Sequence, residues 1–270
     1  MIRRRGREPA AEADRRGPST GAVRPAGGSR RVPRDLAPNP LLLPIVDPRS
    51  PVTERYRRMT THIEHLGARD DHPYRMIVIT SSREAEGKTL TSMNLSLVLA
   101  EDRDRKVVLV DCDLHRPRVH HFLLSKPRIG WMDVFEDRAE LDAAIVSLNQ
   151  SRLKLLPAGR PPDKPAEVIR SERFRRLLRQ LRDRFDAVIL DAPPLMRFVD
   201  ANILNSHADG LVFVIRAGLT SRQIVRKALA QITTGRVIGA VLNDVRYSLV
   251  DRYYYRYDEY GGSYYDRDER

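Results

Sequence analysis

A short apolar run, a loop and an apolar helix pattern follow one another between residues 76 and 100, and this order constrains the fold most strongly. The loop ends in Gly87-Lys88-Thr89. At the start of a helix, backbone N–H groups and such a lysine bind phosphate oxygens, while the hydroxyl contacts Mg²⁺. The pattern therefore predicts a phosphate-binding loop that has a serine at the place of its usual first glycine. The residues expected to bind a nucleotide are Ser82, Glu86, Gly87, Lys88, Thr89 and Leu90.

Strand and helix patterns alternate along most of the chain. Strands are expected at Met76–Thr80, Val107–Val110, Val188–Leu190, Leu211–Ile215 and Val237–Leu242. Helices are expected at Thr53–Leu66, Leu90–Ala100, Phe174–Arg184 and Ser221–Ile232. Strands that are apolar throughout and separated by helices indicate a mostly parallel sheet with helices on both faces. The predicted fold class is α/β, of the P-loop NTPase type, with functional loops at the carboxyl ends of the strands.

Two of the predicted strands end in acidic residues: Asp111 and Asp113 follow one, and Asp191 follows the other. Carboxylates at such strand ends can hold Mg²⁺, orient its waters, or accept a proton from an attacking hydroxyl. As isolated residues, Asp111 and Asp113 are more typical of turns or helix N-caps. Their place one βα unit after the phosphate loop favours catalysis, and Asp191 has the form of a Walker B acid. The predicted catalytic residues are Lys88, Asp111, Asp113 and Asp191, and the predicted metal ligands are Thr89, Asp111 and Asp191.

Both ends of the chain differ from its middle. Residues 1–51 contain nine of the 18 prolines, and residues 1–34 contain ten arginines against three acidic residues. We expect 1–51 to be a disordered basic arm, 52–246 to be the nucleotide-binding domain, and 247–270 to be a flexible tail. The charge of the arm fits solubility or weak contact with a membrane surface better than nucleic-acid binding, because no aromatic residues interleave with the arginines. Eight of the ten tyrosines lie in the tail.

Composition excludes several classes of protein. A single cysteine, Cys112, rules out a disulfide framework and a cysteine-based zinc site. No apolar run approaches the roughly 18 residues that a membrane span needs, and the basic N-terminus lacks the apolar region of a secretory signal. We expect a cytoplasmic protein.

The three motifs together resemble those of the bacterial tyrosine kinases (BY-kinases) that control capsule and exopolysaccharide synthesis, in their cytoplasmic kinase domain. The resemblance covers residues 53–270. The family's first Walker motif is matched by Thr80-Ser81-Ser82 and Glu86-Gly87-Lys88-Thr89, its second by Asp111, Asp113, Arg116 and Pro117, and its Walker B by Asp191, Pro193 and Pro194. Leu155-Leu156-Pro157-Ala158-Gly159, Ala208-Asp209-Gly210, Val241-Leu242-Asn243 and the closing tyrosines also resemble family segments.

Four positions depart from the family pattern. The loop has Glu84-Ala85 where relatives usually carry Pro-Gly, and the added negative charge is expected to weaken nucleotide binding slightly. His115 stands where an arginine usually follows the second aspartate, which removes a fixed cation. Glu54 and Arg57 match the family's oligomerisation signature, but Thr60 occupies its third place.

The resemblance implies Mg²⁺-ATP-dependent protein-tyrosine autophosphorylation that regulates exopolysaccharide or capsule synthesis. It implies that Lys88 and the loop amides hold the β and γ phosphates, that Thr89 and Asp191 hold Mg²⁺, and that Asp111 and Asp113 share metal orientation and activation of the phenol. The division of base and metal roles between Asp111 and Asp113 stays open. The acceptors, modified by a neighbouring subunit, are Tyr253, Tyr254, Tyr255, Tyr257, Tyr260, Tyr264 and Tyr265.

The same resemblance implies partners and a location. The expected partners are a separate membrane-embedded activator or polysaccharide co-polymerase, further copies of the chain in a ring, and a cognate phosphatase, with no specific nucleic acid. The expected location is peripheral, at the cytoplasmic face of the plasma membrane.

Two other functions fit the same fold. A partition- or septum-placing ATPase of the Min/Par kind carries a second lysine early in its phosphate loop, where this chain has Arg83. An ATP-binding pseudokinase scaffold would keep the loop and lack transfer. Phosphate release without labelled tyrosine would indicate the first, and ATP binding without either would indicate the second.

Overall fold

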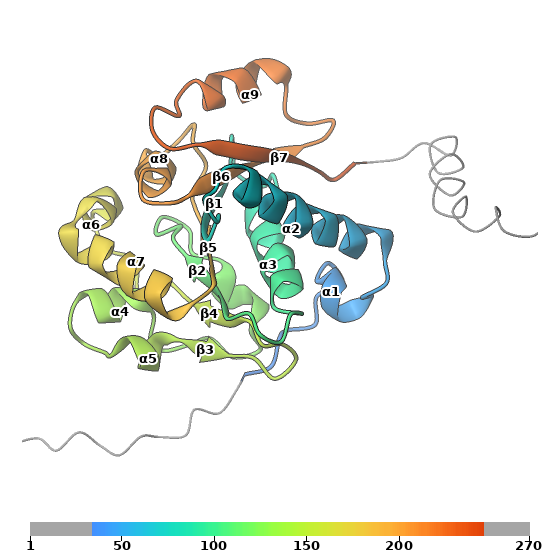
Figure 1. Cartoon of the computed structure of the whole chain (residues 1–270). Coiled ribbons are helices and arrows are strands. Elements are labelled where there is room, and N and C mark those ends of the chain that lie inside the picture. The colour runs from blue at the N-terminus through green and yellow to red at the C-terminus, as the bar shows by residue number, and fades with distance from the viewer. Residues whose placement is uncertain (1–33, 246–270) are drawn as a thin grey trace, which may run out of the picture. The chain divides into compact units, whose positions relative to one another are not determined.

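The computed structural model describes residues 34–245 (Figure 1). Its strands are β1 (Met76–Ser81), β2 (Val107–Asp111), β3 (Val146–Ser147), β4 (Lys154–Leu156), β5 (Ala187–Asp191), β6 (Gly210–Arg216) and β7 (Val237–Asn243). Its α-helices are α1 (Leu43–Val46), α2 (Pro51–Arg69), α3 (Lys88–Leu99), α4 (Trp131–Phe135), α5 (Leu141–Ala144), α6 (Pro165–Arg170), α7 (Glu172–Arg184), α8 (Asp200–Asn205) and α9 (Arg222–Leu229). A 3₁₀ helix, η1, covers Val119–Phe122.

The strands form one sheet in the order β3-β4-β2-β5-β1-β6-β7. All neighbouring strands are parallel except β3 and β4, which are antiparallel. Successive residues of β1 enter opposite cores: Met76 and Val78 lie in one, Ile77 and Ile79 in the other. Both faces of the central strands are therefore buried, and the predicted mostly parallel sheet of the P-loop NTPase class is confirmed.

Helices cover the sheet on both faces (Figure 1). One core contains Ile63 of α2 and Met93 of α3. The other contains Trp131 of α4, Phe174 of α7 and Ala228 of α9. The loops at the carboxyl ends of the strands are consequently held between two packed helical layers.

The expected strands and helices all form, with ends that differ from the predicted ones by up to three residues. Two strands were not predicted. β3 and β4 are only two and three residues long, so they carry no recognisable alternation of apolar and polar residues. Helices α4, α5, α6 and α8 are also too short for the helical period to show in the sequence.

The ordered domain begins earlier than the sequence predicts, because residues 34–50 pack against it. Arg34 and Leu36 make β-bridges to Leu148 and Leu123. Leu42, in the only apolar run of this segment, is 1% exposed. The prediction that disorder extends to residue 51 is therefore wrong for residues 34–51, since burial of this short run offsets the cost of ordering it. The rest of the arm and the tyrosine-rich tail lie outside the described residues.

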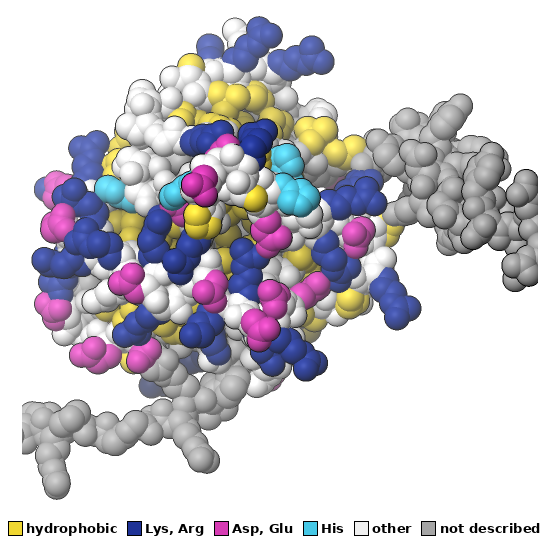
Figure 2. Space-filling view, viewed as in Figure 1, with side chains coloured by type: hydrophobic (Ala, Val, Ile, Leu, Met, Phe, Trp, Pro, Cys, Tyr) yellow, Lys and Arg dark blue, Asp and Glu magenta, His cyan; other side chains and the backbone are white. Residues whose placement is uncertain are grey.

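The described surface shows mixed charge. On the face in Figure 2, basic and acidic side chains lie interspersed rather than in separate fields. Within residues 34–245, no helix has both the length and the hydropathy that crossing a membrane requires.

Candidate active site

The phosphate loop, residues 82–87, connects β1 to α3 and is held in shape by Glu86. The buried Glu86 carboxylate accepts hydrogen bonds from the Ser82 hydroxyl at 3.0 Å, from the Arg83 N–H at 2.8 Å and from the Thr220 hydroxyl. Two predicted nucleotide-binding side chains, Ser82 and Glu86, thus contact each other within the loop. Their side chains shape the loop, and backbone N–H groups of such a loop at a helix start can bind an anion.

Gly87 precedes α3 in a left-handed conformation, with φ of 94°. The amide of Asn243, at the end of β7, donates a hydrogen bond to the Glu86 carbonyl at 3.0 Å. A Cβ atom on residue 87 would lie 1.9 Å from the Asn243 Nδ2 atom. Glycine is required here for two separate reasons, the backbone conformation and the close approach of Asn243.

Comparison of Gly87→Ala with Gly218→Ala should separate these two reasons. Gly218 also has a positive φ, 72°, but among residues 34–245 no atom beyond its chain neighbours would lie within 4 Å of a Cβ added there. Gly218→Ala should cost about 1–2 kcal/mol of folding free energy, the strain of a left-handed residue. Gly87→Ala should cost clearly more in urea denaturation, and adding Asn243→Ala should recover the difference. Equal losses at the two glycines would show that the Asn243 contact is unimportant.

The predicted acidic residues meet at one edge of the sheet. Asp111 and Asp191 are register partners at the ends of β2 and β5. Lys88, the first residue of α3, donates from Nζ to Asp113 Oδ2 at 2.8 Å and lies 4.0 Å from Asp191 Oδ2. The Ser92 hydroxyl, one turn further along α3, donates to Asp191 Oδ1 at 3.1 Å. We call Lys88, Asp111, Asp113 and Asp191 the acid cluster.

Burial controls the protonation of this cluster. It raises the pKa of Asp111 to about 8, and the neighbouring Asp191 adds to this effect. It also raises the pKa of Asp191, against the opposing charge of Lys88. For Lys88, burial acts to lower the pKa, but the carboxylates of Asp191 and Asp113 outweigh it and raise the pKa. Crowded carboxylates that share one cation favour the binding of additional positive charge.

Asp111 and Asp191 differ in what their oxygens contact. Asp111 Oδ2 accepts from the N–H groups of Arg118 and Val119, both at 2.9 Å, so this side chain also fixes the loop after β2. Asp191 Oδ2 is buried and accepts no hydrogen bond among residues 34–245. A buried carboxylate oxygen without a donor, beside Thr89 and a phosphate loop, suits Mg²⁺, which prefers oxygen ligands. Within the described residues, no three His, Cys, Asp or Glu side chains form a metal site by themselves, as is usual where phosphates complete the shell.

Glu84 and His115, which depart from the family pattern, both contact other side chains of the protein. Glu84 pairs with Arg116 and with Arg197, so its charge is balanced within the protein. His115 Nε2 lies 2.6 Å from Asp200 Oδ2, and its ring stacks on Phe198 with centroids 3.5 Å apart. Glu84 is therefore not an isolated charge, and the weakening of nucleotide binding stays a prediction.

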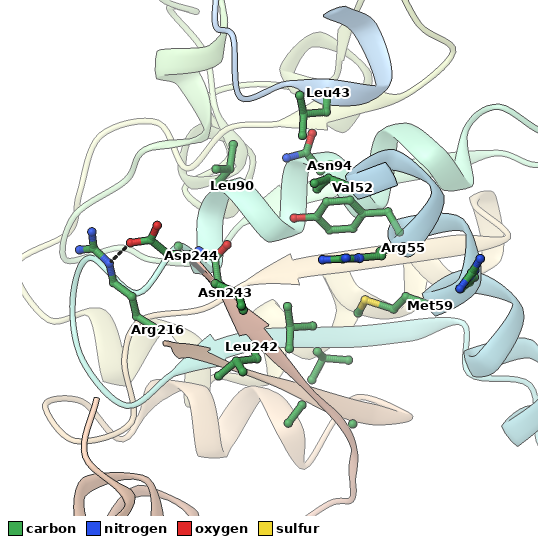
Figure 3. Close-up of a pocket in the computed structure, with 18 of the residues that line it drawn as sticks. Leu43, Val52, Arg55, Met59, Leu90, Asn94, Arg216, Leu242, Asn243 and Asp244 are labelled. Atoms are coloured by element: carbon green, nitrogen blue, oxygen red, sulfur yellow. Dashed lines mark hydrogen bonds and ion pairs between the residues drawn. The ribbon is translucent and has the colours of Figure 1, made fainter. Parts of the chain in front are cut away.

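A cavity of about 910 Å³ adjoins the phosphate loop (Figure 3). Leu43 and Asn94 lie on one side of it, and Leu242 and Asn243 of β7 lie on another. Leu90, a predicted nucleotide-binding residue, lines it together with Gly87. Its size and mainly apolar lining fit a small organic ligand.

Sequence reasoning missed several residues of the site. Ser92 lies four residues after Lys88 and so shares its helix face, a signal that could have found it. No sequence pattern indicates that Thr220 and Arg197 contact the phosphate loop, because each lies more than 100 residues from it in the chain.

Comparison with known proteins identifies the family. A family model described as an AAA domain matches residues 74–237. Tyrosine-protein kinase YwqD of Bacillus subtilis is 32% identical over 216 residues, which cover 79% of this chain and 90% of YwqD. The chain belongs to the bacterial tyrosine-protein kinases. The family resemblance expected from the motifs is therefore confirmed.

Solved structures agree with this assignment. The chimerical protein CapA2B2 superposes on the kinase with a TM-score of 0.73 and 25% identity, over 79% of this chain and 94% of that one. The kinase domain of Escherichia coli tyrosine kinase ETK gives a TM-score of 0.70 and 25% identity, over 79% and 83%. The matched family span contains the phosphate loop and all four residues of the acid cluster.

Proposed function

We propose that this kinase transfers phosphate from Mg²⁺-ATP to tyrosines of its own C-terminal tail, between neighbouring chains, and that this reaction regulates exopolysaccharide or capsule synthesis. The observation that carries the proposal is the acid cluster, in which one buried lysine contacts two carboxylates beside a preformed phosphate loop. The named relatives are kinases rather than scaffolds or positional ATPases.

The residues divide the work as follows. Lys88 and the backbone N–H groups of the loop hold the β and γ phosphates. Thr89 and Asp191 hold Mg²⁺, because Asp191 Oδ2 accepts no hydrogen bond from residues 34–245 and so can act as a metal ligand. Mg²⁺ bound by Thr89 and Asp191 would neutralise negative charge on the transferred phosphoryl group. Asp111 and Asp113 share metal orientation and activation of the acceptor phenol, whose pKa of about 10 requires such help near neutral pH. The cavity beside Gly87 and Asn243 receives the nucleoside.

The location of the tyrosines favours the tail as acceptor. Of the ten tyrosines, only Tyr56 and Tyr74 precede the tail. Tyr74 is 6% exposed, and its hydroxyl donates to Asp70 at 2.7 Å. Burial raises the pKa of Tyr56. Both are poor acceptors, because each would have to leave a packed environment before its hydroxyl could react.

Partners and location follow from the family and belong to the same proposal. They are a membrane-embedded activator or polysaccharide co-polymerase on a separate chain, a homo-oligomeric ring, a cognate phosphatase, and a peripheral position at the cytoplasmic face of the plasma membrane. On α2, Arg57 forms a two-point ion pair with Glu101, both distances being 2.9 Å, and also pairs with Glu54. Two residues of the oligomerisation signature are therefore held in a fixed arrangement on this helix.

The proposal is tested by mixing two full-length variants with Mg²⁺-ATP. One carries Lys88→Met and keeps its tail; the other keeps Lys88 and carries Phe at the seven tyrosines from Tyr253 to Tyr265. Transfer between chains predicts that phosphotyrosine, measured by mass spectrometry, forms on the Lys88→Met chain. The Phe variant alone should lose most of the label that the wild-type chain acquires. A Phe variant that keeps most of the wild-type label, or no label in the mixture despite active wild-type protein, would contradict the proposal.

A further inference from the structure

Three charged side chains from three different loops meet beside the acid cluster. Glu84 belongs to the phosphate loop, Arg116 to the loop after β2, and Arg197 to the loop after β5. Glu84 Oε2 accepts a hydrogen bond from Arg116 Nη1, and Oε1 accepts one from Arg197 Nη1. We call these residues the loop triad. Among residues 34–245, Glu84 is the carboxylate with which both guanidinium groups pair.

The triad carries one uncompensated positive charge and is open to solvent. The side chains of Arg116 and Arg197 are 53% and 57% exposed, and that of Glu84 is 35% exposed. Exposed ion pairs are worth only about 0–1 kcal/mol, so a second carboxylate can displace Glu84 at little cost. Arginine is suited to this exchange, because its planar group recognises carboxylates through paired N–H donors.

Both arginines are held in place by other contacts. The Arg116 N–H donates to Asp113 Oδ1 at 3.0 Å, which fixes its backbone next to the acid cluster. The Arg197 guanidinium lies over the Phe198 ring, 5.4 Å from its centroid, and that ring stacks on His115. The backbone of Arg116 and the guanidinium of Arg197 therefore keep contacts that do not depend on Glu84.

The position of the triad fits the flanks of an acceptor tyrosine. A phenol that is activated by the acid cluster lies close to Asp113, three residues from Arg116. An extended peptide advances about 3.3–3.6 Å per residue, so side chains one or two residues from the acceptor can reach the triad. In the tail, Asp258 and Glu259 directly precede Tyr260.

We propose that Arg116 and Arg197 bind the acidic residues that flank the acceptor tyrosine, and that Glu84 occupies this site as an internal competitor until the acceptor arrives. The inference deepens the proposed autophosphorylation and rests on it. Glu84 and the two arginines then determine which tyrosines are preferred, with Tyr257 and Tyr260, on either side of Asp258 and Glu259, first among those of the tail.

A binding experiment without ATP tests this inference. The probe is a fluorescein-labelled peptide of residues 254–263, and its partner peptide carries Asp258→Asn and Glu259→Gln. The receptor is the full-length chain with the same two substitutions in its own tail, so that the tail does not compete. Fluorescence anisotropy should show about fivefold tighter binding of the acidic peptide, and Arg116→Gln with Arg197→Gln should remove this preference. Glu84→Gln should tighten binding of the acidic peptide about threefold, because the competitor is neutralised.

A matched control lies on α7, where Glu172 pairs with Arg175 and Arg179 at 3.0 and 2.7 Å. Glu172→Gln should leave both peptide affinities unchanged. Equal binding of the two peptides, or an unchanged preference in the double arginine variant, would overturn the inference. Absence of phosphotyrosine in the wild-type chain would instead contradict the proposed function, and the peptide measurement does not depend on it.

Discussion

Lys88→Met is expected to lower tyrosine phosphorylation about 100-fold or more while the domain remains folded. Lys88 is 8% exposed and contacts Asp113 and Asp191. Methionine fills a similar volume without the charge, so it removes the cation that would meet the transferred phosphate. Phosphotyrosine formed over time in full-length protein measures the effect, and far-UV circular dichroism checks the fold.

Two further variants sharpen this prediction. Lys88→Arg keeps the charge but introduces a larger planar group, and it should also fall well below wild-type activity. Lys227→Met changes an exposed lysine at the end of α9 and should retain full activity. Substantial labelling by Lys88→Met, or equal losses in Lys88→Met and Lys227→Met, would show that the active site lies elsewhere.

Asp209→Ala is expected to destabilise the domain by about 3 kcal/mol. Asp209 is 5% exposed at its side chain and precedes β6. Its Oδ2 accepts from the N–H groups of Arg75 and Met76 at 2.9 and 2.7 Å, and its Oδ1 accepts from Arg182 at 2.8 Å. Removing the carboxylate leaves these donors without a partner at the start of β1, in the centre of the sheet. Urea denaturation at pH 7 measures the loss.

The effect of Asp209 should depend on pH. Burial acts to raise the pKa of Asp209, but hydrogen bonds from Met76 and Arg182 outweigh it and lower the pKa. A carboxyl whose pKa is lower in the folded state stabilises fully above its unfolded pKa of about 3.9 and loses this contribution as the pH falls below it. The difference between wild type and Asp209→Ala should therefore shrink as the pH falls below about 4. The exposed Asp183→Ala should change the free energy of unfolding at pH 7 by no more than about 0.5 kcal/mol. A loss at Asp209 that persists undiminished in acid would contradict this account.

Local patterns were sufficient to predict the central strands and the composition of the site. Strands β1, β2, β5 and β6 are short apolar runs because both their faces are buried, and that burial leaves a visible signal. Since parallel strands end at the same edge, residues 111, 113 and 191 could be expected near the loop without knowledge of the strand order.

Contacts between distant segments could not be predicted in this way. From the sequence, Glu84 was interpreted as an unbalanced negative charge beside the phosphates, because its partner Arg197 is 113 residues away. Asn243 reaches Glu86 across 157 residues. The packing of residues 34–50 was also missed, since a single apolar run among prolines gives no period to recognise.

The sequence by itself determined the five longer strands and the four longer helices, where the phosphate loop lies, and that three aspartates follow strands of one sheet, because backbone period and burial act on neighbouring residues. Only the tertiary structure decided that Lys88 contacts Asp113 and Asp191, that Asp191 keeps one oxygen free of hydrogen bonds among the described residues, and that Glu84 joins two arginines. These pairings depend on the paths of loops far apart in the chain, and no local pattern encodes those paths.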